Sequence, residues 1–469
     1  MMTAQTETKP NRTVTDGNGQ AFELTGKVGA GGQGVVCTTS IPGVLAKVAR
    51  PGMPEERRVA WMARIRALMR RPLEGLQVAA PLALALHPRT GAPVGYLMEV
   101  MDGLAPLTGL VETAREENIE GYLRTGGLRK RMRILAKLAR TLADLHGRGL
   151  AYGDLSPANV FVSRSPDHAE VWLIDADNID CVSHDGSQRI YTPDYGAPEI
   201  LRGETGISTL TDSWSFAVIA FRLLTLEHPL KGNMVLDGEP EIEERALRGY
   251  FPWIDHPDDR ANALEPDGLR RVVVEPGSLR LFNRCFGDGL ADPALRPSMA
   301  EWADAFEAAV SKLADCGDCG GAFHFGGGPE CPFCGHVQPA GSVVTLRRYL
   351  YVPPDMLPEG MTEEERRREC WTRTQEVVVV STQPVELREF PADLSPRCRN
   401  VCSVRLSEGG LMVEPGPDAD VSVQAGARAV PISRPQRLPP SPGAAQYLHL
   451  GPAEAPHTAW RISWQAGGR

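Results

Sequence analysis

The sequence has no long apolar run. Eighteen uninterrupted apolar residues occur nowhere, and the first twelve residues are polar and lack the hydrophobic stretch of a secretion signal. These absences argue against a membrane-spanning helix and favour a soluble protein. We expect a cytoplasmic location and no membrane partner.

Basic residues are also fewer than acidic ones. The chain carries 50 lysines and arginines against 59 aspartates and glutamates, which gives a formal net charge of −9. Because nucleic-acid phosphates are bound by basic surfaces, this balance argues against nucleic acid as the main partner.

Cysteine is too sparse for a disulfide scaffold, with ten in 469 residues. Four of them form two C-x-x-C pairs separated by eleven residues, namely Cys316, Cys319, Cys331 and Cys334. This spacing suits one tetrahedral Zn²⁺ bound by four thiolates. A redox pair or incidental cysteines are the alternatives. With four sulfurs available the zinc has no open position for catalysis, so we expect a structural zinc ribbon over residues 315–337.

The character of the sequence changes along its length, and 469 residues are enough for two to four domains. We expect a flexible tail over 1–12, a strand-rich region with one helix over 13–103, and a mainly helical region over 104–314. After the cysteine pairs, residues 341–469 read as a β-rich domain of unknown role. There Trp460, Ile462 and Trp464 alternate as the buried face of a strand.

A phosphate-binding loop is indicated near the start of the strand-rich region. Gly29, Gly31 and Gly34 form G-x-G-x-x-G, which lets backbone N–H groups approach a polyphosphate, although a flexible glycine turn is the alternative. A dinucleotide-binding fold would place a helix directly after the glycines. Here β-compatible residues, beginning with Val35 and Val36, follow instead. We therefore expect a strand-turn-strand cradle, with Val36 among the nucleotide-binding residues.

Lys47 lies on the next expected strand, where its ammonium could reach the α and β phosphates. A helical glutamate would hold it, and either Glu55 or Glu56 could do so. We favour Glu56, although it follows Lys47 at a short interval. An exposed glutamate in the first turn of a helix is the competing interpretation.

Three further polar residues complete a candidate site. Asp154 and Asn159 are spaced D-x-x-x-x-N in a loop after a leucine-striped helix, and Asp175 ends an apolar strand. Asp154 could orient a substrate hydroxyl and accept its proton, whereas Asn159 and Asp175 supply oxygen ligands for Mg²⁺. The joint order of glycine loop, lysine, loop pair and strand-end aspartate is far more specific than any one of them.

This order resembles that of the eukaryotic-like, or Hanks-type, protein kinases over about residues 14–313. The resemblance implies an α+β bilobal kinase fold, followed here by the zinc ribbon and the β-rich domain. It also implies ATP and Mg²⁺ as cofactors. Tyr96–Met101 looks like the gatekeeper and hinge, where Met98 would guard the adenine pocket and backbone groups of Glu99 and Met101 would bind adenine.

Two later motifs support the same resemblance. The stretch 192–199 resembles the end of an activation segment, and its Thr192 favours a serine or threonine hydroxyl as acceptor. The stretch 292–297 resembles a late motif whose Arg296 pairs with Glu199 in a structural clamp. The implied reaction is transfer of the γ-phosphoryl group of ATP to a protein, which could include the kinase itself.

The chain departs from the kinase pattern around the catalytic aspartate. Ser156 replaces the usual lysine, Gly153 the usual arginine, and Asp175-Ala176-Asp177 the usual D-F-G. These features resemble a bacterial branch that includes helix-hairpin-helix and tellurite-resistance-associated kinases. That branch implies a 2C-type phosphatase and a von Willebrand A-type protein as partners. The second hypothesis is a nucleotide-binding pseudokinase or scaffold that recruits partners through the ribbon and the β-rich domain.

Overall fold

The computed structural model describes residues 13–31, 34–181, 191–265, 268–326, 328–381, 383–389, 399–426, 428–441 and 445–465. The expected tail over 1–12 lies outside these ranges. Within them the chain forms two compact units. The first contains residues 13–126, 133–265 and 278–304, and the second contains 127–132, 268–277 and 305–465.

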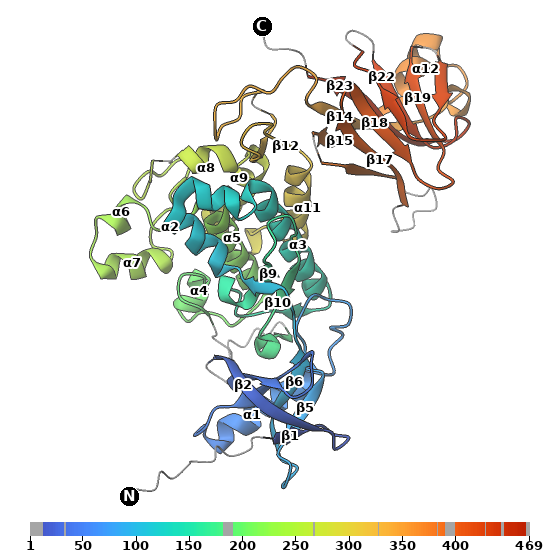
Figure 1. The fold of residues 1–469 in the computed structure, drawn as a ribbon. Helices are drawn as coiled ribbons and strands as arrows, with labels where there is room; N and C mark the ends of the chain where they lie inside the picture. The colour runs from blue at the N-terminus through green and yellow to red at the C-terminus, as the bar shows by residue number, and fades with distance from the viewer. Residues whose placement is uncertain are drawn as a thin grey trace, which may run out of the picture. The chain divides into compact units, whose positions relative to one another are not determined.

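The first unit begins with a small closed barrel of strands in the order β1-β2-β3-β4-β6-β5 (Figure 1). Its elements are β1 (Thr13–Thr15), β2 (Ala21–Ala30), β3 (Gly34–Thr39), β4 (Val44–Ala49), α1 (Glu55–Leu68), β5 (Ala83–Leu86) and β6 (Pro93–Glu99). Gly43, with φ of +81°, makes the turn from β3 into β4. Helix α1 packs Trp61 and Ile65 against Tyr96 and Met98 of β6, which seats the helix beside the lysine-bearing strand.

A mainly helical lobe follows the barrel. Its elements are β7 (Leu104–Pro106), α2 (Thr108–Arg124), α3 (Gly127–Gly147), β8 (Leu150–Ala151), β9 (Val160–Ser163), β10 (Val171–Leu173), β11 (Asp180–Cys181), α4 (Pro198–Leu201), α5 (Thr209–Thr225), α6 (Asn233–Leu236), α7 (Pro240–Leu247), α8 (Gly268–Val273), α9 (Pro276–Asn283), α10 (Gly289–Ala291) and α11 (Met299–Val310). Among them α8 belongs to the second unit, and α3, α9 and α11 each contribute residues to both units. Short 3₁₀ turns cover Pro157–Asn159, Ala176–Asn178 and Pro293–Leu295, and a π turn covers Arg284–Asp288.

Helix α5 is the centre of this lobe. The helix starts at a capping box formed by Ser208 and Thr211. From Thr211 to the end of the helix, nearly every residue is buried. Its Trp214 and Phe221 pack edge-on against Phe286, and Phe216 packs against Trp302. This aromatic core fixes α5, which in turn holds the loop that carries Asp154.

The second unit ends in two stacked antiparallel sheets (Figure 1). One has the order β15-β14-β23-β22-β19-β20 and the other β16-β17-β18-β21. The elements are β12 (Leu313–Asp315), β13 (Ala322–His324), β14 (Val344–Tyr351), a 3₁₀ turn (Pro354–Met356), α12 (Glu363–Glu369), β15 (Trp371–Val380), β16 (Val385–Glu389), β17 (Arg399–Ser407), β18 (Gly410–Pro415), β19 (Val421–Ala425), β20 (Arg428–Pro431), β21 (Gln436–Leu438), β22 (Gln446–Leu450) and β23 (His457–Trp464). Trp460 and Ile462 lie in the core between the sheets and Trp464 packs against it, as predicted.

None of the helices in the described ranges is both long and apolar enough to span a bilayer.

Candidate active site

The glycine loop lies over the strand-end aspartate. Gly29 of β2 pairs with Val36 of β3, and the Gly31 N–H donates to the carbonyl of Gly34 at 2.9 Å. A β-carbon on Gly34 would come within 2.8 Å of the Val48 carbonyl oxygen, so only glycine fits there. A β-carbon on Gly31 would lie 4.0 Å from Oδ2 of Asp175, which places the loop directly above that carboxylate.

Lys47 meets two carboxylates. Its Nζ donates to Oδ1 of Asp175 and, at 2.7 Å, to Oδ2 of Asp177. The Lys47 side chain is 4% exposed, that of Asp177 is fully buried, and that of Asp175 is 31% exposed. Burial alone would lower the pKa of Lys47, but Asp177 and Asp175 outweigh burial and raise it. The ammonium therefore stays charged in a largely water-free site.

The structure corrects the prediction that Glu56 holds Lys47. It lies in the first turn of α1 and is exposed, and the hydrogen bonds of Lys47 go to Asp175 and Asp177 instead. The face of α1 that points to the site carries Trp61, whose Nε1 donates to Oδ2 of Asp177 at 2.9 Å. The competing interpretation of Glu56 as an exposed first-turn glutamate fits this structure.

Asp175 adopts a left-handed backbone conformation, with φ of +58°. For a residue other than glycine this conformation costs roughly 1–2 kcal/mol. It turns the chain sharply at the end of β10, so that Ala176–Asn178 form a 3₁₀ turn that brings Asp177 back under Lys47. Burial raises the pKa of Asp175, with Lys47 opposing this shift and Asp177 adding to it.

The loop after β8 places Asp154 and Asn159 together. Asn159 Nδ2 donates to the backbone carbonyl of Asp154 at 2.9 Å, and Thr192 Oγ1 donates to Oδ1 of Asp154 at 2.8 Å. The loop is anchored from α5, because the carboxylate of Asp212 accepts the backbone N–H groups of Tyr152 and Gly153 at 2.6 and 2.9 Å. Thr192 contacts the Asp154 carboxylate and Asp212 holds the backbone before it, so the two residues together set the direction of that carboxylate.

The predicted hinge, Tyr96–Met101, covers the end of β6 and the two residues after it. Met98 is buried with Trp61 and Tyr96, Glu99 is exposed, and Met101 is partly exposed. The Val100 N–H donates to the carbonyl of Gly43 at 2.9 Å, which ties the hinge to the β3–β4 turn. The roles of these residues in adenine binding stay predictions.

The Glu199–Arg296 clamp is confirmed. Nη1 and Nη2 of Arg296 donate to the two carboxylate oxygens of Glu199 at 2.7 and 2.8 Å, and both side chains are buried. The guanidinium also lies over the ring of Trp214 at 4.8 Å. The clamp joins α4 to the turn before α11, away from the candidate chemistry.

Sequence reasoning missed four residues at the site, namely Trp61, Tyr96, Tyr152 and Asp177. Tyr96 OH donates to Oδ1 of Asp177, and Tyr152 OH donates to the carbonyl of Ile174 beside Asp175. Burial raises the pKa of both tyrosines well above the usual value, so both hydroxyls remain donors. One signal was available: the sequence has a second carboxylate two residues after Asp175, and such a carboxylate needs a cation if it is buried.

The four paired cysteines form a separate cluster in the second unit. Their sulfurs all lie within 4.8 Å of one another, with 3.6 Å between Cys316 and Cys334 and 3.8 Å between Cys319 and Cys331. Thiolates around zinc, at about 2.3 Å from the ion, would stand about 3.8 Å apart. Gly320 and Gly335 follow the second cysteine of each pair with φ of +69° and +75°. The donor set and its spacing fit one tetrahedral zinc ion.

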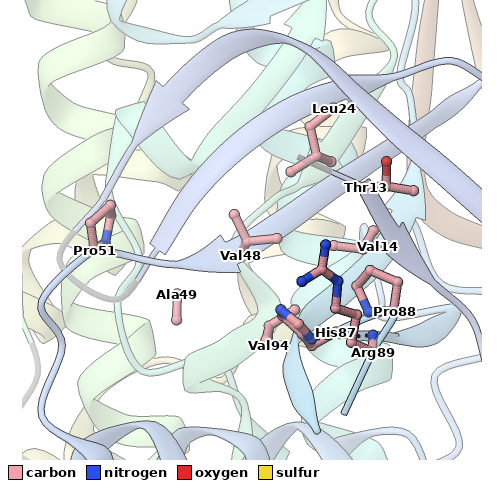
Figure 2. A pocket seen from close by; sticks show the side chains of 10 residues that line it. All are labelled: Thr13, Val14, Leu24, Val48, Ala49, Pro51, His87, Pro88, Arg89 and Val94. Atoms are coloured by element: carbon pink, nitrogen blue, oxygen red, sulfur yellow. Dashed lines mark hydrogen bonds between the residues drawn. The ribbon is translucent and has the colours of Figure 1, made fainter. Parts of the chain in front are cut away.

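A hollow of about 420 Å³ lies elsewhere on the barrel (Figure 2). Its wall includes Val14, Val48, Val94 and the turn that bears His87 and Arg89. Neither Lys47 nor the site carboxylates line it. This hollow is therefore distinct from the candidate active site.

The fold and the site have the features of a protein kinase domain, and comparison with known proteins agrees for part of the chain. Residues 97–264 match the protein kinase domain family. Pkn2, a serine/threonine-protein kinase of Myxococcus xanthus, is 30% identical over 188 residues, which are 38% of this chain and 20% of pkn2. The family match covers part of the chain and supports a protein kinase domain with a bilobal α+β fold.

Two other bacterial kinases are also similar to part of this chain. The serine/threonine-protein kinase PknD of Chlamydia pneumoniae is 26% identical over 293 residues, 55% of this chain and 30% of PknD. PknG of Mycobacterium leprae is 30% identical over 186 residues, 39% of this chain and 21% of PknG. The matched part thus spans less than a third of each of these three kinases.

Proposed function

We propose that this protein is an ATP- and Mg²⁺-dependent kinase that phosphorylates serine or threonine hydroxyls of proteins, itself included. Two contacts support the proposal: Lys47 meets Asp175 beneath Gly31, and Asn159 meets Asp154. The Ile174 N–H, which donates to the Asn159 carbonyl at 3.0 Å, joins the two pairs. The members of these pairs come from β4, the loop after β8 and the end of β10. Folding for stability alone gives no reason to gather them.

The residues fit Mg²⁺ by their chemistry. Asp175 offers a partly exposed carboxylate and Asn159 an amide oxygen, and oxygen ligands are those that Mg²⁺ prefers. Bound there, the ion would neutralise charge on the phosphates. In this proposal Lys47 and the N–H groups of the Gly29–Gly34 loop hold the phosphates, while Val36, Met98, Glu99 and Met101 surround the adenine.

Asp154 directs the acceptor. The substrate hydroxyl donates its hydrogen bond to the Asp154 carboxylate, and its oxygen attacks the γ-phosphorus as the bond to the β-phosphate oxygen breaks. The proton passes to Asp154, and ADP leaves. Thr192, at 2.8 Å from Asp154, supports a serine or threonine acceptor.

The zinc ribbon and the partners complete the proposal. Four thiolates would hold a structural Zn²⁺ at Cys316, Cys319, Cys331 and Cys334. By resemblance to the bacterial branch, we place the reaction in the cytoplasm, with a 2C-type phosphatase and a von Willebrand A-type protein as partners.

The test is phosphate transfer from radiolabelled ATP with Mg²⁺, with Asp154→Ala beside the natural chain. We expect labelled protein from the natural chain and a loss of at least about 100-fold in Asp154→Ala. Asp167→Asn, which neutralises an exposed aspartate in the β9–β10 loop, is the matched control and should keep full activity. Nucleotide binding without transfer by the natural chain would favour the pseudokinase alternative, which the buried Ser156 in place of lysine motivates.

A further inference from the structure

Asp177 is a fully buried carboxylate at the junction of three elements. It accepts hydrogen bonds from Lys47 of β4 at 2.7 Å, from Trp61 of α1 at 2.9 Å and from the hydroxyl of Tyr96 of β6. Two of these donors meet the same oxygen, Oδ2. A carboxylate removed from water is retained only where a cation and hydrogen-bond donors compensate it, and Lys47 is that cation.

The two carboxylates around Lys47 differ in what they can do. Asp175 is 31% exposed and lies beneath Gly31, where a metal ion and phosphates can reach it. Asp177 is enclosed, and its described partners are side chains of β4, α1 and β6. An ammonium group has three donors, so Lys47 can keep its bond to Asp177 while it turns the others toward phosphate.

Helix α1 presents no carboxylate that could hold Lys47. Its residues that point inward are Trp61, Met62, Ile65 and Leu68, and Glu55 and Glu56 lie in its exposed first turn. Trp61 of α1 donates its indole N–H to Asp177, and Asp177 in turn accepts a hydrogen bond from Lys47. The helix therefore acts on Lys47 through Asp177.

We propose that Asp177 is the positioning residue of Lys47, in the place that a helical glutamate would otherwise take. The inference rests on the proposed function, because it assigns Lys47 to the phosphates of ATP. The lysine is then aligned by the Asp175–Asn178 turn that also carries the metal carboxylate, independently of any charge on α1. Assembly of the phosphate site and of the metal site becomes a single event.

The experiment compares Asp177→Asn, Lys47→Met and the double variant with the natural chain. Asp177→Asn keeps the shape of the side chain and removes its charge. We expect kcat/KM for ATP to fall by about 100-fold, the loss typical of a misplaced catalytic group. Because Asp177 acts through Lys47, the double variant should be no worse than Lys47→Met alone. Losses that multiply in the double variant would overturn the inference.

Binding of ATP and of adenosine separates positioning from a general loss of structure. Adenosine lacks the phosphates that Lys47 contacts, so Asp177→Asn should weaken ATP binding by about tenfold and adenosine binding by less than about twofold. Equal weakening of both ligands would mean a structural role only. Glu56→Gln is the direct rival: if it reproduces the selective loss and Asp177→Asn does not, the helix holds the lysine.

The two proposals fail in different ways. If the natural chain binds Mg-ATP but transfers no phosphate, the proposed function fails, and the selective effect of Asp177→Asn on ATP binding can still be measured. If the natural chain is active and Asp177→Asn retains its kcat/KM within about threefold, only the positioning role is wrong.

Discussion

His228 shows how one buried side chain can fix the segment that bears Thr192. Its Nε2 lies 3.0 Å from the carbonyl of Asp194, and its Nδ1 accepts the N–H of Leu230 at 3.1 Å. This arrangement requires a neutral ring, which donates once and accepts once. Burial lowers the pKa of His228 to about 3, and the positive charges of Lys231 and Arg222 contribute to that shift against the opposing Asp194.

The pH dependence follows from this neutral ring. In the unfolded chain the ring binds a proton below its ordinary pKa of about 6.5, whereas in the folded chain it does so only near pH 3. Stability is therefore complete above pH 6.5 and is lost as the pH falls, by about 2 kcal/mol at pH 5. Urea unfolding at pH 7.5 and pH 5 measures the loss. The amide of His228→Gln can still donate to the Asp194 carbonyl but does not titrate. In this variant the loss of unfolding free energy between pH 7.5 and pH 5 should be smaller by about 2 kcal/mol. An unchanged loss would show that His228 is not the group responsible.

At this scale the order of motifs along the chain predicted that Lys47 lies near Asp175 and that Asp154 and Asn159 share one loop, and the contacts within each pair agree. It did not predict which acid meets Lys47. That choice depends on the rotation of α1 about its axis, which is set when Trp61 and Ile65 pack against β6. A glutamate in the first turn of a helix gives no information about that rotation.

Among the elements, the link between α4 and the turn before α11 depends on one buried ion pair. Replacing Glu199 by Gln leaves the guanidinium of Arg296 buried with a neutral partner. Loss of one member of a buried pair costs about 3–5 kcal/mol, because the remaining charge is desolvated without compensation. We expect Glu199→Gln to lower the unfolding free energy of the kinase domain by such an amount, measured by urea denaturation.

An exposed pair in the same domain provides the control. Glu170 pairs with Lys137 at 2.7 Å, and their side chains are 57% and 50% exposed. Glu170→Gln should cost no more than about 1 kcal/mol, since water and ions screen such pairs. Equal losses in the two variants would mean that burial of the Glu199–Arg296 pair contributes nothing.

Element types were more predictable than their pairing. The β3–β4 hairpin could be read from Val35, Val36 and the Pro42–Gly43 turn, because both the β-compatible residues and the turn are local signals. Closure of the barrel could not be read in this way. It requires the three-residue strand β1 to pair with β5, where Thr15 meets Leu86, and nothing local to either residue specifies that contact.

At the scale of the whole molecule, the cysteine cluster is part of the second unit's packing. Cys316 and Cys331 share a buried cluster with Phe323, Val343 and Val379. Ser311 accepts the N–H of Val379 at 2.7 Å, and the Ser381 hydroxyl donates to Asp315 at 3.0 Å. The cysteine cluster thus packs against β15 and against the residue that precedes β14. The spacing of the four cysteines could be recognised in the sequence. The contacts of the ribbon with Val343, Val379 and Ser381 could not, because they join residues far apart along the chain.

Metal content therefore bears on the folding of this unit. We expect one zinc per chain by elemental analysis, and none after Cys331→Ser, since three thiolates and a hydroxyl bind zinc poorly. Because ribbon and sandwich share apolar contacts, loss of zinc should also lower the melting temperature of the second unit by several degrees. Cys370→Ser, which alters another buried thiol of that unit, should keep the zinc. A natural chain that holds no stoichiometric zinc, or a Cys331→Ser variant that retains it, would show that the four cysteines gather without binding a metal.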